Sequence, residues 1–111
     1  MDELLTEVQA LADAEYERAA EKFGRVNNSR HESYAVILEE FEEAQDLLEI
    51  IKLDMEILWT NTKSNSERER ILDHLKTIRT NAECAAAEWI QVAAMAYKAE
   101  LTELEKGGER E

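Results

Sequence analysis

Four glutamates stand in stretches where a helix is expected to be apolar, and their carboxylates could share one cation. Glu39, Glu40 and Glu43 lie within five residues of one another, and Glu88 lies in a separate stretch. Carboxylate oxygens are the ligands that Mg²⁺ and Mn²⁺ prefer in proteins. These residue types therefore indicate a site for a hard divalent cation.

The first three glutamates share a helix face with apolar residues. Each residue of a helix advances by about 100°, so seven residues form the centre of an apolar face: Tyr34, Ile37, Phe41, Ala44, Leu48, Ile51 and Met55. Val36, Leu47 and Ile50 extend this face on one side; Glu40 and Glu43 project within the extension, and Glu39 lies at its edge. No basic residue occurs between His31 and Ile51, so repulsion between these carboxylates requires a cation or raised pKa values.

Glu88 is the single charged residue in the stretch 84–97, in which Gln91 is the only amide. A helix that is apolar nearly all round is predicted to be buried. An ionised buried carboxylate without a partner costs several kcal/mol, and a divalent metal would provide that partner. The alternative is a protonated acid, or one that is bonded to His31, His74 or Arg79.

Three helices are expected to position these residues, at about 2–22, 30–59 and 67–105. Gly24 ends the first helix. Two capping boxes, Ser29 with Glu32 and Ser66 with Glu69, start the other two helices. The polar run 60–65 should separate the second helix from the third, since its side chains compete for backbone hydrogen bonds.

The predicted fold class is all-α, an antiparallel helical bundle with two long helices and a shorter N-terminal helix. A single domain should span residues 1–106, and residues 107–111 should form a flexible tail. The broad apolar faces predict that oligomerisation completes the bundle, as a homodimer or a homotetramer.

The chain of 111 residues has a formal net charge of −13, with 44% hydrophobic and 35% charged residues. Such acidity argues against nucleic acid and anionic membranes as partners, whereas a basic protein partner is compatible with it. A single cysteine forms no intramolecular disulfide and fits a reducing compartment. The start of the chain does not read as a signal peptide, and no apolar run reaches the roughly 20 residues of a membrane span. A cytoplasmic location is expected.

The two acidic motifs resemble those of the MazG-like all-α nucleoside triphosphate pyrophosphohydrolases of bacteria and phages. Residues 39–43 match the Glu-Glu-x-x-Glu motif of that family, and residues 88–91 match Glu-x-x-Asp except that Gln91 replaces the aspartate. The 44 residues between the two motifs are more than the usual gap in that family.

This resemblance implies that Mg²⁺ or Mn²⁺ is held by Glu39, Glu40, Glu43 and Glu88, with Gln91 as a neutral ligand. It also implies hydrolysis of a nucleoside triphosphate to the monophosphate and pyrophosphate, with Glu39 or Glu43 accepting a proton from water. Further residues are candidates for contact with the nucleotide: Trp59, Trp89 and Lys98. The two tryptophans are equally compatible with a role in the core of the bundle.

Two other functions remain open at this point. The substitution by Gln91 favours a non-catalytic protein that sequesters a nucleotide or a nucleotide-like signal on the same scaffold. The net charge of −13 also fits an acidic interaction or inhibitor protein of the phage type, which would cover a basic surface of its target.

Overall fold

The computed structural model describes residues 2–106 and contains three helices: α1 (Asp2–Phe23), α2 (Arg30–Lys63) and α3 (Arg68–Lys106). Within these residues there is no strand, and the all-helical prediction is confirmed. The predicted flexible tail, residues 107–111, lies outside the described residues. No helix of the described part combines the length and the apolar character that a membrane span requires.

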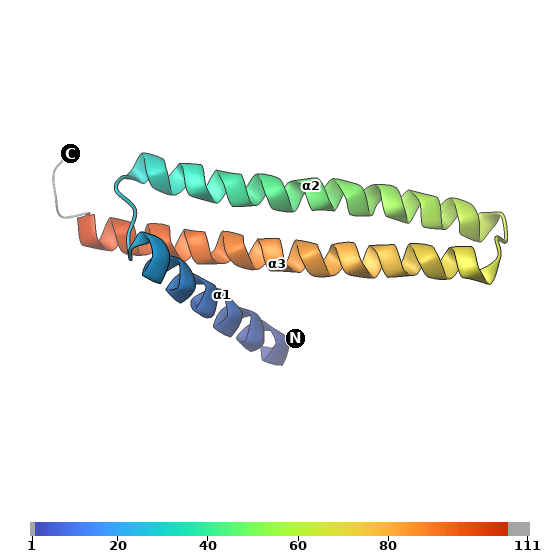
Figure 1. Ribbon diagram of the computed structural model, residues 1–111, viewed down its shortest axis with the longest axis horizontal. Helices are drawn as coiled ribbons and strands as arrows, with labels where there is room; N and C mark the ends of the chain where they lie inside the picture. The colour runs from blue at the N-terminus through green and yellow to red at the C-terminus, as the bar shows by residue number, and fades with distance from the viewer. Residues whose placement is uncertain (1, 107–111) are drawn as a thin grey trace.

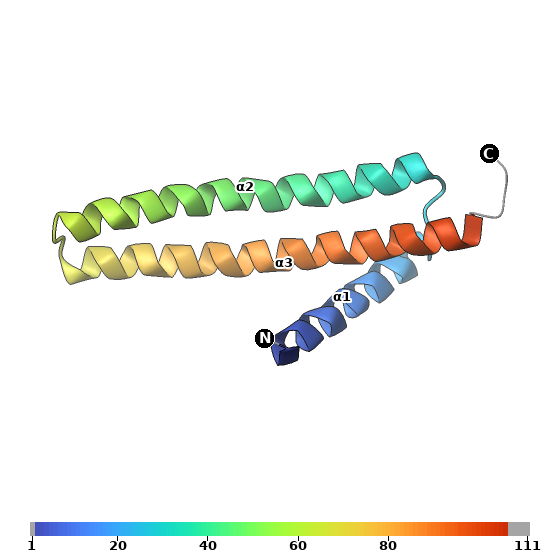
Figure 2. The same cartoon turned by 180° about the vertical axis from the view of Figure 1, so that it is seen from behind.

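The helices α2 and α3 lie side by side and run in opposite directions, as Figures 1 and 2 show. Helix α1 packs against α3 near the end that carries the C-terminus and diverges from it toward its own N-terminus. The molecule measures 64 × 28 × 24 Å, with a radius of gyration of 18.7 Å. A globular chain of this length has a radius near 13 Å, so the fold is elongated.

A short loop between α1 and α2 is fastened to the end of α3. Gly24 stops α1 in a left-handed conformation (φ 99°), which a residue with a Cβ rarely adopts. Beyond it, the Asn27 N–H donates to Thr102 Oγ1 (2.9 Å), and the Asn27 amide donates to Ser33 Oγ (2.8 Å). Tyr16 is buried on α1 and donates from its hydroxyl to the Arg25 carbonyl (2.8 Å). These bonds bring all three helices together at one end.

The predicted capping box at the start of α2 forms in a modified way. Ser29 is the N-cap, and its hydroxyl accepts from the Glu32 N–H (3.1 Å). The Glu32 carboxylate accepts from the N–H of Asn28 (2.6 Å), one residue before the position that the motif predicts. The start of α2 is thus fixed by its own first turn.

The turn between α2 and α3 departs from the sequence prediction. Helix α2 continues to Lys63 rather than ending near Trp59, because the side chains of Asn61 and Thr62 donate to carbonyls one turn back (2.9 and 2.8 Å). The predicted Ser66–Glu69 box was also wrong. The Ser66 hydroxyl donates to Asn61 Oδ1 (2.8 Å) and so closes the turn, leaving α3 to begin at Arg68.

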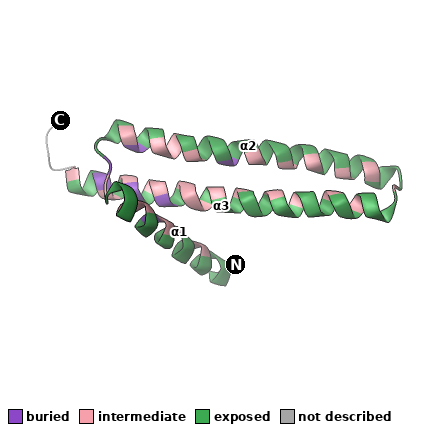
Figure 3. Cartoon of the chain, viewed as in Figure 1, coloured by how far each residue is buried: buried purple, intermediate pink, exposed green. Residues whose placement is uncertain are grey.

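Burial is concentrated where the three helices meet, and most of the hairpin beyond this point is exposed or half-buried (Figure 3). Only a few residues of the described chain are buried: Tyr16, Asn27, Ser33, Ala44, Ala94, Lys98 and Thr102. Four of these seven are polar, which is unusual for a core. Three of these polar residues, Asn27, Ser33 and Thr102, are joined by hydrogen bonds that fasten the loop to α2 and α3.

Candidate metal centre

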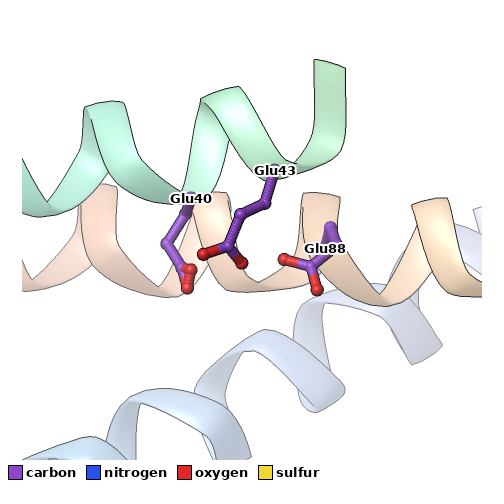
Figure 4. Close-up of side chains that lie close together, drawn as sticks. All are labelled: Glu40, Glu43 and Glu88. Carbon is purple, nitrogen blue, oxygen red and sulfur yellow. The ribbon is translucent and has the colours of Figure 1, made fainter. Parts of the chain in front are cut away.

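Three glutamates from two helices converge on one point of the hairpin. Glu40 and Glu43 extend from α2 and Glu88 extends from α3, as Figure 4 shows. One carboxylate oxygen from each lies within 4.8 Å of the others. Glu40 and Glu88 are half-buried, and Glu43 is exposed. The cluster is therefore close enough for three ligands to bind one cation and is open on one side.

These carboxylates have no basic partner. Within residues 2–106, no lysine, arginine or histidine forms an ion pair with Glu40, Glu43 or Glu88. Glu40 Oε2 and Glu88 Oε2 are buried and accept no hydrogen bond. An orphaned buried oxygen is costly, and a hard divalent cation held by this cluster would offset that cost.

Burial and the neighbouring carboxylates favour the protonated forms of Glu40 and Glu88. Burial raises the pKa of Glu40 above its usual value, and the charges of Glu43, Glu88 and Glu39 raise it further. Burial also raises the pKa of Glu88, and a side-chain hydrogen bond with Glu43 adds to this effect. Of the alternatives for Glu88, the structure favours a protonated acid. His74 contacts Asn61 instead, and Arg79 pairs with Glu83.

A cavity of about 430 Å³ adjoins the cluster, and Glu40 belongs to both. Its remaining wall comes from all three helices and from the loop between α1 and α2: Ala19, Phe23, Val26, Asn27, Asn28, Glu32, Val36, Glu39, Gln91, Met95 and Lys98. The wall combines apolar side chains with amide groups, carboxylates and one ammonium group. This composition suits a small polar ligand with an apolar part.

Lys98 is the cation of this cavity, and it is only 6% exposed. No carboxylate of the described chain pairs with it. Its backbone carbonyl accepts from the Thr102 hydroxyl (2.7 Å), which belongs to the network that fastens Asn27. The Lys98 ammonium therefore gives the cavity a positive charge that no carboxylate of residues 2–106 balances, and an anionic ligand would complement it.

The other predicted ligands lie beside the cluster rather than within it. Glu39 is exposed and lines the cavity, and it is not among the three carboxylates that converge. Gln91 also lines the cavity, but its amide nitrogen donates to Glu15 Oε2 on α1 (2.6 Å). The Gln91 carbonyl oxygen is the acceptor of this side chain, and its amide nitrogen has a second N–H besides the one that bonds to Glu15.

The two tryptophans that sequence reasoning assigned to the nucleotide do not line this cavity. Trp59 lies 19 residues after Glu40 on the same helix, about 28 Å along its axis, and its ring lies under the Lys63 ammonium (5.3 Å). Trp89 makes an edge contact with Phe41, with ring centroids 5.8 Å apart. Both side chains are substantially exposed.

Sequence reasoning missed two groups around the cavity. Asn27 and Asn28 lie in the loop between α1 and α2, and periodicity offers no signal for a buried loop amide. Glu15 could have been found, because it follows Leu11 by four residues and precedes Ala19 by four. That spacing places Glu15 within the apolar stripe of α1, just as Glu40 lies within that of α2.

Comparison of the chain with protein-family models, with curated proteins and with solved structures found no match.

Proposed function

We propose that this protein is a Mg²⁺- or Mn²⁺-dependent pyrophosphohydrolase that converts a nucleoside triphosphate to the monophosphate and pyrophosphate. One observation carries the proposal. A cluster of three carboxylates with two orphaned buried oxygens shares Glu40 with a cavity that contains an unpaired, buried lysine. In a complex of a metal ion with a polyphosphate, the cation would bind the carboxylates and a phosphate would bind Lys98. The acidic motifs, which resemble those of MazG-like enzymes, suggest the reaction type.

Glu40, Glu43 and Glu88 would hold the cation. When bound, a cation of this kind neutralises phosphate charge and lowers the pKa of a coordinated water. Its fit to the site rests on the orphaned oxygens of Glu40 and Glu88, which no donor of the described chain satisfies.

The remaining groups of the cavity have separate roles in this proposal. The Lys98 ammonium binds a phosphate oxygen and fixes the end of the ligand that carries the charge. Glu39 lies on the wall without belonging to the cluster, and it accepts the proton of the attacking water. The water oxygen bonds to phosphorus as the bond to pyrophosphate breaks. Val36 and Met95 provide apolar contacts for the nucleoside.

A second candidate function is sequestration of the same class of ligand without turnover. It is favoured by Gln91, which occupies the position of an expected aspartate and whose amide is bonded to Glu15. With this carboxylate replaced, the site keeps three acidic ligands and would have weaker control over a second cation or a water.

A panel of nucleotides with Mg²⁺ or Mn²⁺, followed by thermal shift and by pyrophosphate release, tests both functions. If the protein is a hydrolase, Glu40→Gln and Glu88→Gln should each reduce the rate of pyrophosphate release by about 10–100-fold, the loss typical when a group that supports a metal site is removed. Glu42→Gln is the matched control. Glu42 lies between Glu40 and Glu43 in the first motif, but it is exposed and does not belong to the cluster. Stabilisation without product would select sequestration, and no response to any nucleotide would reject both functions.

A further inference from the structure

One long face of the hairpin is apolar and lacks a covering helix. On α2, residues at intervals of seven form a row that is substantially exposed: Tyr34, Phe41, Leu48 and Met55. A second row with the same interval lies against α3 and is half-buried or buried: Ile37, Ala44, Ile51 and Leu58. Two apolar rows with a period of seven are typical of a helix that packs against other helices along both rows. In this structure only one row is covered.

Helix α3 extends the same face. Trp89 contacts Phe41, which places it beside the exposed row of α2. Further exposed residues are spaced from Trp89 by three, four or seven positions or their sums: Leu75, Ala82, Ala86 and Ala93. We call these residues, together with Trp59 and the exposed row of α2, the heptad face. None of these residues is charged, and the exposed charged residues beside them include Lys52, about 20° from Phe41 around α2, and Arg79, four residues after Leu75 on α3.

Helix α1 leaves this face uncovered. It packs against α3 only, and in both views α3 lies between α1 and most of α2 (Figures 1 and 2). The cavity opens elsewhere around α2. Phe41 follows Glu39 by two residues and is therefore about 160° away from it around the helix. An occupant of the heptad face would not compete with a ligand in the cavity.

The surface area of the elongated chain is large enough for a contact of the size that a stable dimer needs. The chain exposes 8424 Å², whereas a globular monomer of 12.8 kDa exposes about 6,300 Å². The excess is roughly 2,100 Å². If each of two copies buried half of this excess, the interface would total about 2,100 Å², which is in the range of permanent dimers. In a two-fold dimer the same apolar row would lie on both sides of the interface.

We propose that the heptad face is the interface of a homodimer, in which two α2–α3 hairpins pack against each other as a closed four-helix bundle. The exposed row of α2 then fills the layer between the hairpins. The alanines of α3 allow the partner helices to approach closely. The two cavities lie on the outer sides of this dimer. The proposal is independent of whether the cavity binds a nucleotide.

A matched pair of substitutions tests the assignment of this face. Leu48 is 46% exposed in the isolated chain and lies on the heptad face, whereas Leu53 is 59% exposed and lies about 140° away on the same helix. Sedimentation equilibrium at micromolar concentrations should show the wild type and Leu53→Glu at twice the chain mass. Leu48→Glu should be monomeric, with a dissociation constant raised at least about 100-fold by the two buried carboxylates.

Measurements on the unaltered chain keep the proposal testable if Leu48→Glu fails to fold. Trp59 and Trp89 both lie on the heptad face and are more than 40% exposed in the isolated chain. Acrylamide quenching of their fluorescence should be weak in the dimer and should increase on dilution. A monomeric wild type, quenching that does not change on dilution, or equal responses of the two leucine variants would overturn the proposal. Mass that rises without limit would exclude a closed dimer.

Discussion

Protons and a divalent cation would compete for the carboxylate oxygens of Glu40 and Glu88. Each has one carboxylate oxygen that is buried and without a hydrogen-bond donor. In the metal-free protein, burial and the neighbouring glutamates raise the pKa of both groups. A divalent cation requires the ionised form, so its binding displaces these protons. Low pH would therefore favour the metal-free, protonated site, whereas higher pH would favour binding of a cation.

The stability of the metal-free protein should reflect this protonation. A raised pKa means that the folded state binds more protons than the unfolded state, so the free energy of unfolding falls as pH rises from about 4.5 through the raised values. Urea unfolding in the presence of a chelator should show this fall. The double variant Glu40→Gln, Glu88→Gln should lack that part of the dependence, and an unchanged profile would contradict the account.

The pair Arg30–Glu103 cannot explain such a fall, because its sign is opposite. A hydrogen bond from Arg30 lowers the pKa of Glu103. That group contributes stability above its ordinary pKa and loses it as pH falls through the lowered value.

Lys98 should separate the binding of a nucleotide from the binding of the metal. Lys98→Met keeps the length and the apolar stem of the side chain but removes the ammonium group. We expect the affinity for a nucleoside triphosphate to fall at least about tenfold, since a hydrogen bond to a charged group contributes about 1.5–3 kcal/mol. Calorimetry with Mn²⁺ alone should show no comparable loss. Equal losses in both titrations would place Lys98 outside the phosphate site.

At the scale of the helices, the turn between α2 and α3 determines which acidic residues lie opposite each other. Glu43 lies 20 residues before Lys63, the end of α2, and Glu88 lies 20 residues after Arg68, the start of α3. Two helices that run in opposite directions from a short turn bring such positions level with each other. The long interval between the two motifs therefore extends the hairpin beyond the site without separating the ligands.

Much of the fold and part of the candidate site could be predicted from the sequence, because periodicity and local caps determine the helices. The stop at Gly24, the cap at Ser29 and the inward placement of Glu40 and Glu88 all belong to that category. The end of α2 could not be predicted, since hydroxyl and amide side chains can either break a helix or bond within it. The burial of Asn27 also depends on contact with Thr102, which is 75 residues away in the sequence.

Tyr16 should be the residue that fastens α1 to the hairpin. Its ring packs edge-on against Tyr97, with centroids 5.0 Å apart, and its hydroxyl bonds to the Arg25 carbonyl. Tyr16→Phe should cost about 1 kcal/mol of unfolding free energy, and Tyr16→Ala should cost about 3–5 kcal/mol. Chemical denaturation measures both. Leu53→Ala, at an exposed position outside the heptad face, should change the stability by less than about 0.5 kcal/mol, and a larger effect there would count against this assignment.

At the scale of the whole molecule, an elongated shape is combined with a charge of −13 per chain. The proposed dimer brings two such charges together through an uncharged face. Repulsion between the copies is long-ranged and is screened by salt, whereas contact between apolar residues is not weakened by it.

Added salt should therefore strengthen the dimer. Raising the ionic strength from about 0.01 M to 0.15 M shortens the screening length from about 30 Å to 8 Å, and the dissociation constant should fall several-fold. Sedimentation velocity across this range measures the change. Leu48→Glu should stay monomeric throughout. A dimer that weakens as salt is added would indicate an interface held by ion pairs, contrary to the uncharged heptad face.

The cation site itself is tested most directly by anomalous diffraction from crystals that are soaked in Mn²⁺. The account predicts an anomalous peak at bonding distance from oxygens of Glu40, Glu43 and Glu88, and no such peak in Glu88→Gln. A manganese ion bound only elsewhere, or no ion at bonding distance from these carboxylates at saturating Mn²⁺, would contradict it.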